Sequence, residues 1–390
     1  MKLPFLIQAL LLYFAAGTIP ASATSTRVNL IRTPDHGIQP QAEIDRQGVV
    51  HLIYFKGDPG GGDIFYVQRA PGQAGFSPPL PVNHQPGSAM ALGTIRGAQL
   101  AVGRNGRVHM VWDGLGKGAA PVSLGGKAAA PLLYARLNDA GTAFEPERNL
   151  ITYAAGLDGG SSVAADQAGN VYVTWHAPQT GNTNGEAGRT VFVTLSRDEG
   201  KTFPRESPAL SQPVGACACC GMRAFADRSG TAYILFRAAT GGVDRDETLL
   251  VSRQPGARFE IANAHKWIAS VCPMSSATLT AADGGALAAW ETAEQVYYAK
   301  INPRTLQVSA LTSPAGGTAR KHPVAVANDK GETLLVWTEG TGWARGGAVA
   351  WQVYGAGGEP TSPAGHADGV PAWSLATAFA QPSGDFVIVY

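Results

Sequence analysis

Residues 166–175 read Asp-Gln-Ala-Gly-Asn-Val-Tyr-Val-Thr-Trp, a polar turn followed by an apolar run that ends in a large ring. Asp166 and Gly169 favour a tight turn, since glycine adopts left-handed backbone angles without steric cost. The run from Val171 to Trp175 has the composition and length of a buried strand. The stretch therefore predicts a β-hairpin whose second strand enters the core.

The same pattern occurs seven times along the chain. In each copy a glycine precedes an aromatic residue by six positions, and successive glycines are 47 to 63 residues apart. The pairs are Gly48/Tyr54, Gly106/Trp112, Gly169/Trp175, Gly230/Phe236, Gly284/Trp290, Gly331/Trp337 and Gly384/Tyr390. A period of this size indicates a repeat architecture rather than several unrelated domains.

A second strand follows the aromatic residue in six of the copies, and a polar turn with a weaker outer strand comes next. In the second copy these strands are residues 132–137 (LLYARL) and 144–150 (FEPERNL). Four strands per copy predict an all-β fold, a β-propeller of four-stranded blades. Seven blades are favoured, and six are possible if one terminal copy is degenerate. Residues 27–31 resemble an outer strand, so we expect them to complete the last blade and close the ring.

The first 23 residues have the features of a secretory signal peptide. Lys2 precedes an apolar run, residues 3–16, and Ala21-Ser22-Ala23 matches a small-x-small cleavage pattern. We expect residues 24–390 to form a single propeller domain that is exported, either periplasmic or secreted. No membrane span is expected after cleavage, and a monomer is expected.

The charge balance argues against a nucleic-acid partner. The chain has 30 basic and 29 acidic residues, and loss of Lys2 with the signal leaves equal numbers. A neutral chain without a basic run lacks the positive surface that a phosphate backbone requires. The partners left open are a small molecule, a carbohydrate or another protein.

One turn of the third copy matches a known motif. The sequence of residues 196–203 fits S-x-D-x-G-x-T-[WF], the Asp-box, through Ser196, Asp198, Gly200, Thr202 and Phe203. On these residues the chain resembles the sialidase-like, BNR-repeat β-propellers, in which the box is a structural turn between the third and fourth strands of a blade. For active members the resemblance implies a glycoside hydrolase with arginines on the substrate carboxylate, a Tyr–Glu nucleophile pair and an aspartate acid/base. Residues 32–34, Arg-Thr-Pro, are similar to the family's R-I-P motif but lie further from the hairpin that follows.

Propeller topology sorts the loops onto two faces. Because strands alternate in direction, the loops within a blade after its second strand share a face with the loops between blades, and these longer loops more often carry function. Three residues there are candidates for cleaving a glycosidic bond: Glu291, Asp113 and Arg237. His176 follows Trp175 and is a candidate ligand-binding residue, with a solvated loop histidine as the alternative.

All four cysteines fall in two loops of this face. Cys217, Cys219 and Cys220 precede the fourth copy of the repeat, and Cys272 precedes the fifth. Consecutive blades are neighbours, so the two loops should touch. One interpretation is two structural disulfides, one joining the loops through Cys272 and the other within residues 217–220.

Two other interpretations of the cysteines stay open. Thiolates with Met222 and Met274 nearby suit Cu(I), and four thiolates suit Zn. A redox-active thiol pair is the third interpretation. Copper or zinc is therefore the cofactor that the cysteines admit, and no other cofactor is indicated.

The stretch between the cysteine loops adds three ligand-binding candidates, Arg245, Asp246 and Trp267. Together with the C-x-C-C and C-P-M patterns, it resembles exported bacterial propellers described as sialidase-like. The alternative is a surface ion pair for Arg245–Asp246 and a blade-packing ring for Trp267.

Three functions follow from these observations. The first is a binding or accessory propeller that holds a ligand or soft metal through its cysteine-bearing loops. The second is a glycoside hydrolase of the exo-sialidase type that uses rim carboxylates. The third is a protein-interaction module, and the choice between enzyme and binding protein stays open.

Overall fold

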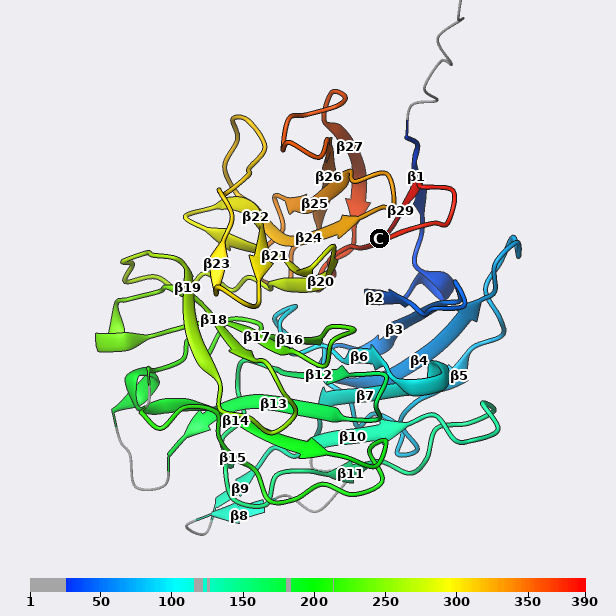
Figure 1. Ribbon diagram of the computed structural model, residues 1–390. Helices are drawn as coiled ribbons and strands as arrows, with labels where there is room; N and C mark the ends of the chain where they lie inside the picture. The colour runs from blue at the N-terminus through cyan, green and yellow to red at the C-terminus, as the bar shows by residue number, and fades with distance from the viewer. Residues whose placement is uncertain (1–25, 116–121, 125–126, 180–183, 213) are drawn as a thin grey trace, which may run out of the picture.

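Seven sheets follow one another around a central axis in the computed structural model, which describes residues 26–115, 122–124, 127–179, 184–212 and 214–390 (Figure 1). The protein is a seven-bladed β-propeller, as the repeat predicts, and the six-bladed alternative is wrong. The expected signal peptide and its cleavage site lie outside the described residues.

Six blades are antiparallel sheets of four strands, each ordered from the axis outward. Blade 1 contains β2 (Ile38–Ile44), β3 (Val50–Asp58), β4 (Gly61–Arg69) and β5 (Leu80–Pro81). Blade 2 contains β6 (Gln99–Val102), β7 (Val108–Asp113), β10 (Leu132–Arg136) and β11 (Arg148–Asn149). Blade 3 contains β12 (Ser161–Ala165), β13 (Val171–Pro178), β14 (Arg189–Ser196) and β15 (Ser207–Pro208).

The next three blades repeat this order. Blade 4 contains β16 (Arg223–Ala226), β17 (Ala232–Arg237), β18 (Glu247–Ser252) and β19 (Glu260–His265). Blade 5 contains β20 (Thr278–Ala282), β21 (Gly285–Thr292), β22 (Gln295–Asn302) and β23 (Gln307–Val308). Blade 6 contains β24 (Arg320–Ala327), β25 (Thr333–Glu339), β26 (Gly347–Tyr354) and β27 (Gly365–Val370).

Short elements lie in the connections. A small hairpin, β8 (Val122–Leu124) and β9 (Lys127–Ala129), interrupts the link from β7 to β10. Single 3-10 turns are η1 (Pro34–His36), η2 (Arg104–Gly106), η3 (Gly185–Gly188) and η4 (Thr240–Gly242).

The turn between the first two strands of each blade is built as the repeat predicts. The repeat glycine has a positive φ in all seven blades, from 73° at Gly106 to 92° at Gly169. Where an Asp or Asn stands three residues earlier, its side chain closes the turn. Asp166 Oδ1 accepts the backbone N–H groups of Ala168 and Asn170 at 2.8 and 2.9 Å. Side chain and glycine together therefore set the reversal locally.

The repeated aromatic residue, in or directly after each second strand, is buried, and the four tryptophans among them pack between neighbouring blades. Four tryptophans of this kind are at most 1% exposed: Trp112, Trp175, Trp290 and Trp337. At about 25 cal/mol per Å² and roughly 150 Å² per ring, each contributes up to about 4 kcal/mol of burial. The repeated ring is thus the main cross-blade contact that the sequence pattern encodes.

The seventh blade closes the ring through the N-terminal strand, in part as expected. It contains β28 (Thr377–Ala380), β29 (Phe386–Val389) and β1 (Val28–Ile31), and Figure 1 shows β1 beside β29. β1 is the outermost strand of this sheet, as predicted, but it takes the third place, directly beside β29, and runs parallel to it. The exposed edge of β29 needs partners for its backbone groups, and β1 satisfies them.

Arg32 reinforces this closure. Its Nη1 atom donates to the carbonyl of Gly369 at 2.7 Å, and its guanidinium lies 4.1 Å from the ring centre of Tyr390. Arg32 of the Arg-Thr-Pro stretch, which is similar to the R-I-P motif, therefore links blade 6 to the end of blade 7.

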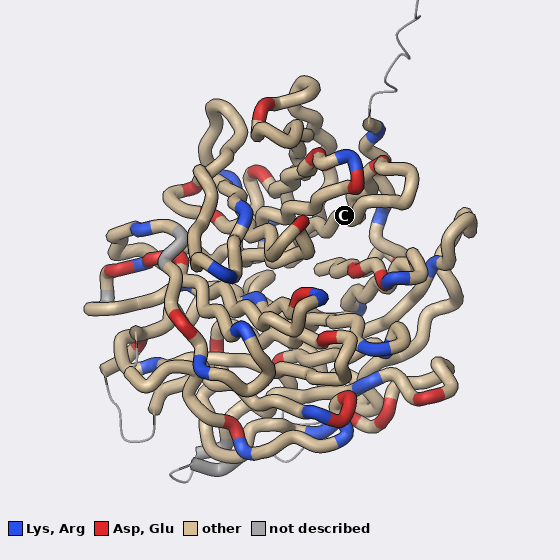
Figure 2. The backbone as a smooth tube through the Cα atoms, in the orientation of Figure 1, with Lys and Arg blue, Asp and Glu red and all other residues tan. Residues whose placement is uncertain are grey.

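In the view of Figure 2, acidic and basic residues are interspersed along the chain, and neither kind gathers in one continuous patch. Among the described residues no helix has the length and apolarity to cross a bilayer.

Candidate functional site: the cysteine-bearing loops

Two loops between blades carry the cysteines and meet on one face of the propeller. The loop from β15 to β16 holds Cys217, Cys219 and Cys220, and the loop from β19 to β20 holds Cys272. The backbone N–H of Gly221 donates to the carbonyl of Ser275 at 3.0 Å, which ties the loops together. The predicted contact between the two loops is confirmed.

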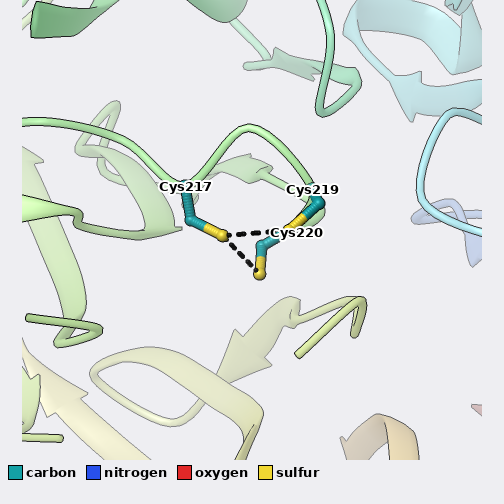
Figure 3. A group of neighbouring side chains, drawn as sticks. All are labelled: Cys217, Cys219 and Cys220. Carbon is teal, nitrogen blue, oxygen red and sulfur yellow. Dashed lines mark hydrogen bonds between the residues drawn. The ribbon is translucent and has the colours of Figure 1, made fainter. Parts of the chain in front are cut away.

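A disulfide links Cys219 to Cys272, so the predicted bridge through Cys272 is confirmed. Cys217 and Cys220 are free thiols, and both are buried. The Cys217 sulfur lies 3.1 Å from the Cys220 sulfur and 3.5 Å from the Cys219 sulfur (Figure 3). The predicted second disulfide within residues 217–220 is therefore not formed in this structure. Two buried thiols, Cys217 and Cys220, lie next to the Cys219–Cys272 disulfide.

The two free thiols differ in their acidity. A hydrogen bond with Cys220 lowers the pKa of Cys217, because it stabilises the thiolate more than the thiol. Burial raises the pKa of Cys220 well above its usual range. Cys217 is therefore the thiol of the pair that ionises first.

Glu186 of η3 holds the cysteine loop in place. Its Oε1 atom accepts the backbone N–H of Ala218 at 2.6 Å, and its carbonyl accepts that of Ala216 at 3.0 Å. Its Oε2 atom pairs with Arg245 at 2.7 Å. Sequence reasoning missed Glu186, since it lies in a loop of blade 3 without a motif.

Arg245 and Asp246 do not form the surface ion pair that was the alternative. Arg245 is buried and pairs with Glu186, while Asp246 Oδ1 accepts the backbone N–H of Trp267 at 2.9 Å. Arg245, Asp246 and Trp267 therefore make structural contacts beside the cysteine loop. Their role in ligand binding stays a prediction.

Arg237 lies beneath the same loops in a buried ion pair. Its Nη2 atom is 3.0 Å from Glu247 Oε2, its Nη1 atom donates to the carbonyl of Arg245 at 2.7 Å, and Trp267 covers it at 5.2 Å. Burial raises the pKa of Glu247 to about 7 despite the opposing charge of Arg237. Glu247 is a second functional-face residue that was not singled out from the sequence.

The two candidate carboxylic acids are buried rather than solvent-facing. Glu291 Oε1 accepts the backbone N–H of Glu294 at 2.6 Å, and burial raises its pKa. Asp113 ends β7, and burial raises its pKa to about 8 while the charge of Arg96 opposes the shift. Carboxylic acids with a raised pKa on a loop face are candidates for proton transfer. The catalytic role of Glu291 and Asp113 stays a prediction.

His176 is buried, and the alternative of a solvated loop histidine is wrong. Its Nδ1 atom accepts a hydrogen bond from Arg189 Nε at 2.9 Å. The neutral ring therefore carries its proton on Nε2, and that atom is buried without a partner. Burial lowers the pKa of His176 well below its usual range.

The two methionines are not placed alike. Met222 belongs to the core between blades 3 and 4, where its sulfur accepts a hydrogen bond from Thr174 at 3.2 Å. Met274 lines a cavity of about 30 Å³ with Thr94, Lys321 and His322. The predicted part of either methionine in binding a metal stays a prediction.

The Asp-box lies in the turn from β14 to β15, as predicted. Asp198 accepts hydrogen bonds from Ser196 and Thr202, and Phe203 packs edge-on against Tyr134 of blade 2 at 4.9 Å. The turn is a structural link between blades 2 and 3.

Comparison with known proteins supports the propeller fold and does not identify a family or an activity. No protein-family model matches the chain, and no curated protein matches it either. A protein of unknown function from Dyadobacter fermentans shares 15% identity over 89% of this chain and 99% of its own, with a TM-score of 0.52. Hadza microbial sialidase Hz136 shares 16% identity over 80% of this chain and 68% of its own, with a TM-score of 0.50.

An α-L-arabinanase from Penicillium chrysogenum shares 12% identity over 89% of this chain and 98% of its own, with a TM-score of 0.46. Sialidases and other propeller enzymes thus stand among the structural neighbours. At these identities the likeness shows the propeller fold alone. The Asp-box family and the cysteine subgroup stay predictions.

Proposed function

We propose that the protein is an exported binding propeller that holds a soft metal ion, Cu(I), at its cysteine-bearing loops. One observation carries the proposal: the sulfur atoms of Cys217, Cys219 and Cys220 all lie within 4.8 Å of one another. Two of these sulfurs, those of Cys217 and Cys220, belong to free thiols, and polarisable thiolates are ligands that Cu(I) and Zn prefer over hard cations.

The available donors favour Cu(I) over Zn. A structural zinc site takes four ligands in a tetrahedron, while Cys219 is already bonded to Cys272. His176 cannot supply a nitrogen in its present tautomer, because Arg189 occupies Nδ1 and the proton occupies Nε2. Cys217 and Cys220 remain as a buried pair of sulfur ligands, a low coordination number that soft Cu(I) tolerates.

The test is a Cu(I) titration of the purified, disulfide-containing protein without oxygen, against a chromophoric Cu(I) chelator. We expect one equivalent of Cu(I) per chain, and at least about a hundredfold loss of affinity in Cys217→Ser and in Cys220→Ser. Met222→Leu is the matched control, since it removes a nearby sulfur that lies in the core. Equal affinity in Cys217→Ser and the parent would overturn the proposal, as would tighter binding of Zn than of Cu(I).

A second candidate is a glycoside hydrolase, and the buried acids favour it. Asp113 has a pKa of about 8, as a general acid requires, and the sialidase among the structural neighbours supports this class of reaction. Fluorogenic glycosides, including a sialoside, test it. Turnover that falls at least about a hundredfold in Asp113→Asn or Glu291→Gln supports the hydrolase, and no turnover by the parent rejects it.

A further inference from the structure

The sulfur atoms of the buried dithiol and of the neighbouring disulfide form a continuous series of contacts, which we call the line of sulfurs. The Cys217 sulfur lies 3.1 Å from the Cys220 sulfur and 3.5 Å from the Cys219 sulfur, so it contacts both a free thiol and the disulfide. Cys219 in turn is bonded to Cys272. The order along the line is therefore Cys220, Cys217, Cys219 and Cys272.

The line runs from the interior to the surface. Cys217 and Cys220 are 1% and 3% exposed, Cys219 is half-buried, and Cys272 is exposed. A thiolate exchanges with a disulfide by attacking one of its sulfurs, and contact between the attacking and the attacked sulfur is the first requirement. Cys217 meets that requirement toward Cys219.

We propose that these four cysteines form a thiol–disulfide relay that moves one disulfide between the surface pair Cys219–Cys272 and the buried pair Cys217–Cys220. The proposal concerns the metal-free protein and goes beyond metal binding. It stands on the contacts of the four sulfurs and on their gradient of burial.

The first step joins Cys217 to Cys219. The Cys217 thiol loses its proton, its sulfur attacks Cys219, the bond from Cys219 to Cys272 breaks, and Cys272 leaves as a thiolate that takes up a proton. The product has a Cys217–Cys219 disulfide, a free Cys220 thiol and a free Cys272 thiol at the surface.

The second step joins Cys220 to Cys217. The Cys220 thiol loses its proton, its sulfur attacks Cys217, and Cys219 leaves as a thiolate that takes up a proton. Over both steps the buried pair is oxidised by two electrons and the surface pair is reduced by two, so no external oxidant is needed. The exposed dithiol that results can reduce an external disulfide, which is the class of substrate the surface pair admits.

Backbone hydrogen bonds hold the loop around the attacking cysteine. Glu186 holds the backbone of Ala216 and Ala218 on both sides of Cys217, and the N–H of Cys217 donates to the carbonyl of Arg237 at 2.9 Å. The attacking residue is therefore held by three backbone contacts, while only side-chain sulfurs change partners.

The experiment follows Cys272 in the folded, metal-free protein. Protein with one disulfide and two thiols is kept with a metal chelator and N-ethylmaleimide, and peptide mapping by mass spectrometry gives the state of each cysteine over time. We expect Cys272 to become alkylated in a first-order phase whose rate does not depend on the maleimide concentration, because exchange limits it. The molecules so trapped should carry either a Cys217–Cys219 or a Cys217–Cys220 disulfide.

Two variants separate the steps. Cys217→Ser removes the attacking sulfur, and alkylation of Cys272 should slow at least about tenfold. Cys220→Ser removes only the second step, so Cys272 should still be alkylated while Cys217–Cys219 accumulates as the sole disulfide. Cys220→Ser thus also controls for a general loosening of the loop by loss of a buried sulfur.

Oxidised glutathione tests the external substrate. The parent should reduce one equivalent and end with both pairs as disulfides, and Cys217→Ser should react at least about tenfold more slowly. The relay is overturned if Cys272 of the parent stays unalkylated in the folded protein, or if it reacts equally fast in Cys217→Ser. Because a chelator is present throughout, either result is independent of whether Cu(I) binds.

Discussion

The Asp-box turn and the cysteine-bearing loops connect strands on opposite faces of the same propeller, and they are built in opposite ways. In the Asp-box, Ser196, Asp198 and Thr202 satisfy one another within seven residues of chain. The cysteine loops instead depend on Glu186, Arg237 and Arg245, which come from blades 3 and 4.

The two regions also differ in unsatisfied polar groups. Buried side-chain atoms without a hydrogen-bond partner on the cysteine face include His176 Nε2, Arg245 Nη1, Glu247 Oε1 and Glu291 Oε2. Within the described part of the chain, no side-chain atom of the Asp-box is in that condition. Each buried polar atom without a partner lowers the free energy of unfolding by about 1–3 kcal/mol. Proteins tend to keep such atoms where a functional requirement outweighs stability. The Asp-box thus satisfies its own polar groups, whereas the cysteine face retains several buried polar atoms that are unpaired.

The largest effect that would test this contrast is removal of the buried charge under the cysteine loops. Arg237→Met leaves Glu247 without its partner at 3.0 Å, and we expect a loss of about 3–5 kcal/mol in the free energy of unfolding. Urea denaturation measures it. The double variant with Glu247→Leu should recover more than half of the loss, and a single-variant loss below about 1 kcal/mol would contradict the buried-pair assignment.

A methyl group in the Asp-box should have the next largest effect. A Cβ atom at Gly200 would lie 1.7 Å from the Tyr134 hydroxyl, and Gly200 has a φ of 75°. We expect Gly200→Ala to lower the free energy of unfolding by about 2–4 kcal/mol. Gly72 has a φ of 78° but no atom within 4 Å of the added Cβ, so Gly72→Ala should cost only about 1–2 kcal/mol. Equal losses would show that the blade contact does not matter.

The acid on the functional face should make stability depend on pH. Burial raises the pKa of Asp113 from its ordinary 3.8 to about 8 in the folded protein. The folded state therefore holds a proton that the unfolded chain releases, and the stability present below pH 4 is lost as the pH rises toward 8. Asp113→Asn should remove this loss, gaining about 1–3 kcal/mol on the parent between pH 5 and pH 7.5 in urea titrations. A constant difference across this range would refute the shift.

The smallest effect should come from the Asp-box carboxylate. Hydrogen bonds from Ser196 and Thr202 outweigh burial and lower the pKa of Asp198 to about 2. Asp198→Ala should cost about 1 kcal/mol at pH 7, measured by thermal unfolding, and leave Cu(I) binding unchanged. A change in Cu(I) affinity would mean that the two faces are coupled.

Much of the fold was predictable because its signals are local. A glycine at positive φ and a buried ring recur in each blade, and an Asp or Asn closes the turn in four of them, so the hairpins and their number follow from spacing. The N-terminal strand was correctly expected to complete the last blade, but its place within that blade was not predictable. Residues 27–31 suit any outer strand, and pairing beside β29 depends on an edge that exists only after the ring forms.

The candidate site also has features that the sequence predicts and features that it does not. The meeting of the cysteine loops follows from blade order, and the bond from Cys219 to Cys272 follows only from distances across two loops. Glu186 carries no sequence signal, since one acid in a glycine-rich loop looks like any solvated side chain. Burial of His176 and Asp113 was missed because a polar residue after a strand usually faces water, whereas here neighbouring loops cover them.

The amino-acid sequence by itself determined the β-propeller, its seven blades, the Asp-box turn and the gathering of the cysteines on one face. Turn chemistry and periodicity act over a few residues and can therefore be seen in the chain. Only the tertiary structure decided which cysteines bond, which acids are buried and which loop residue clamps the site. Those outcomes depend on distances and desolvation between segments far apart in sequence, and these exist only once the ring has closed.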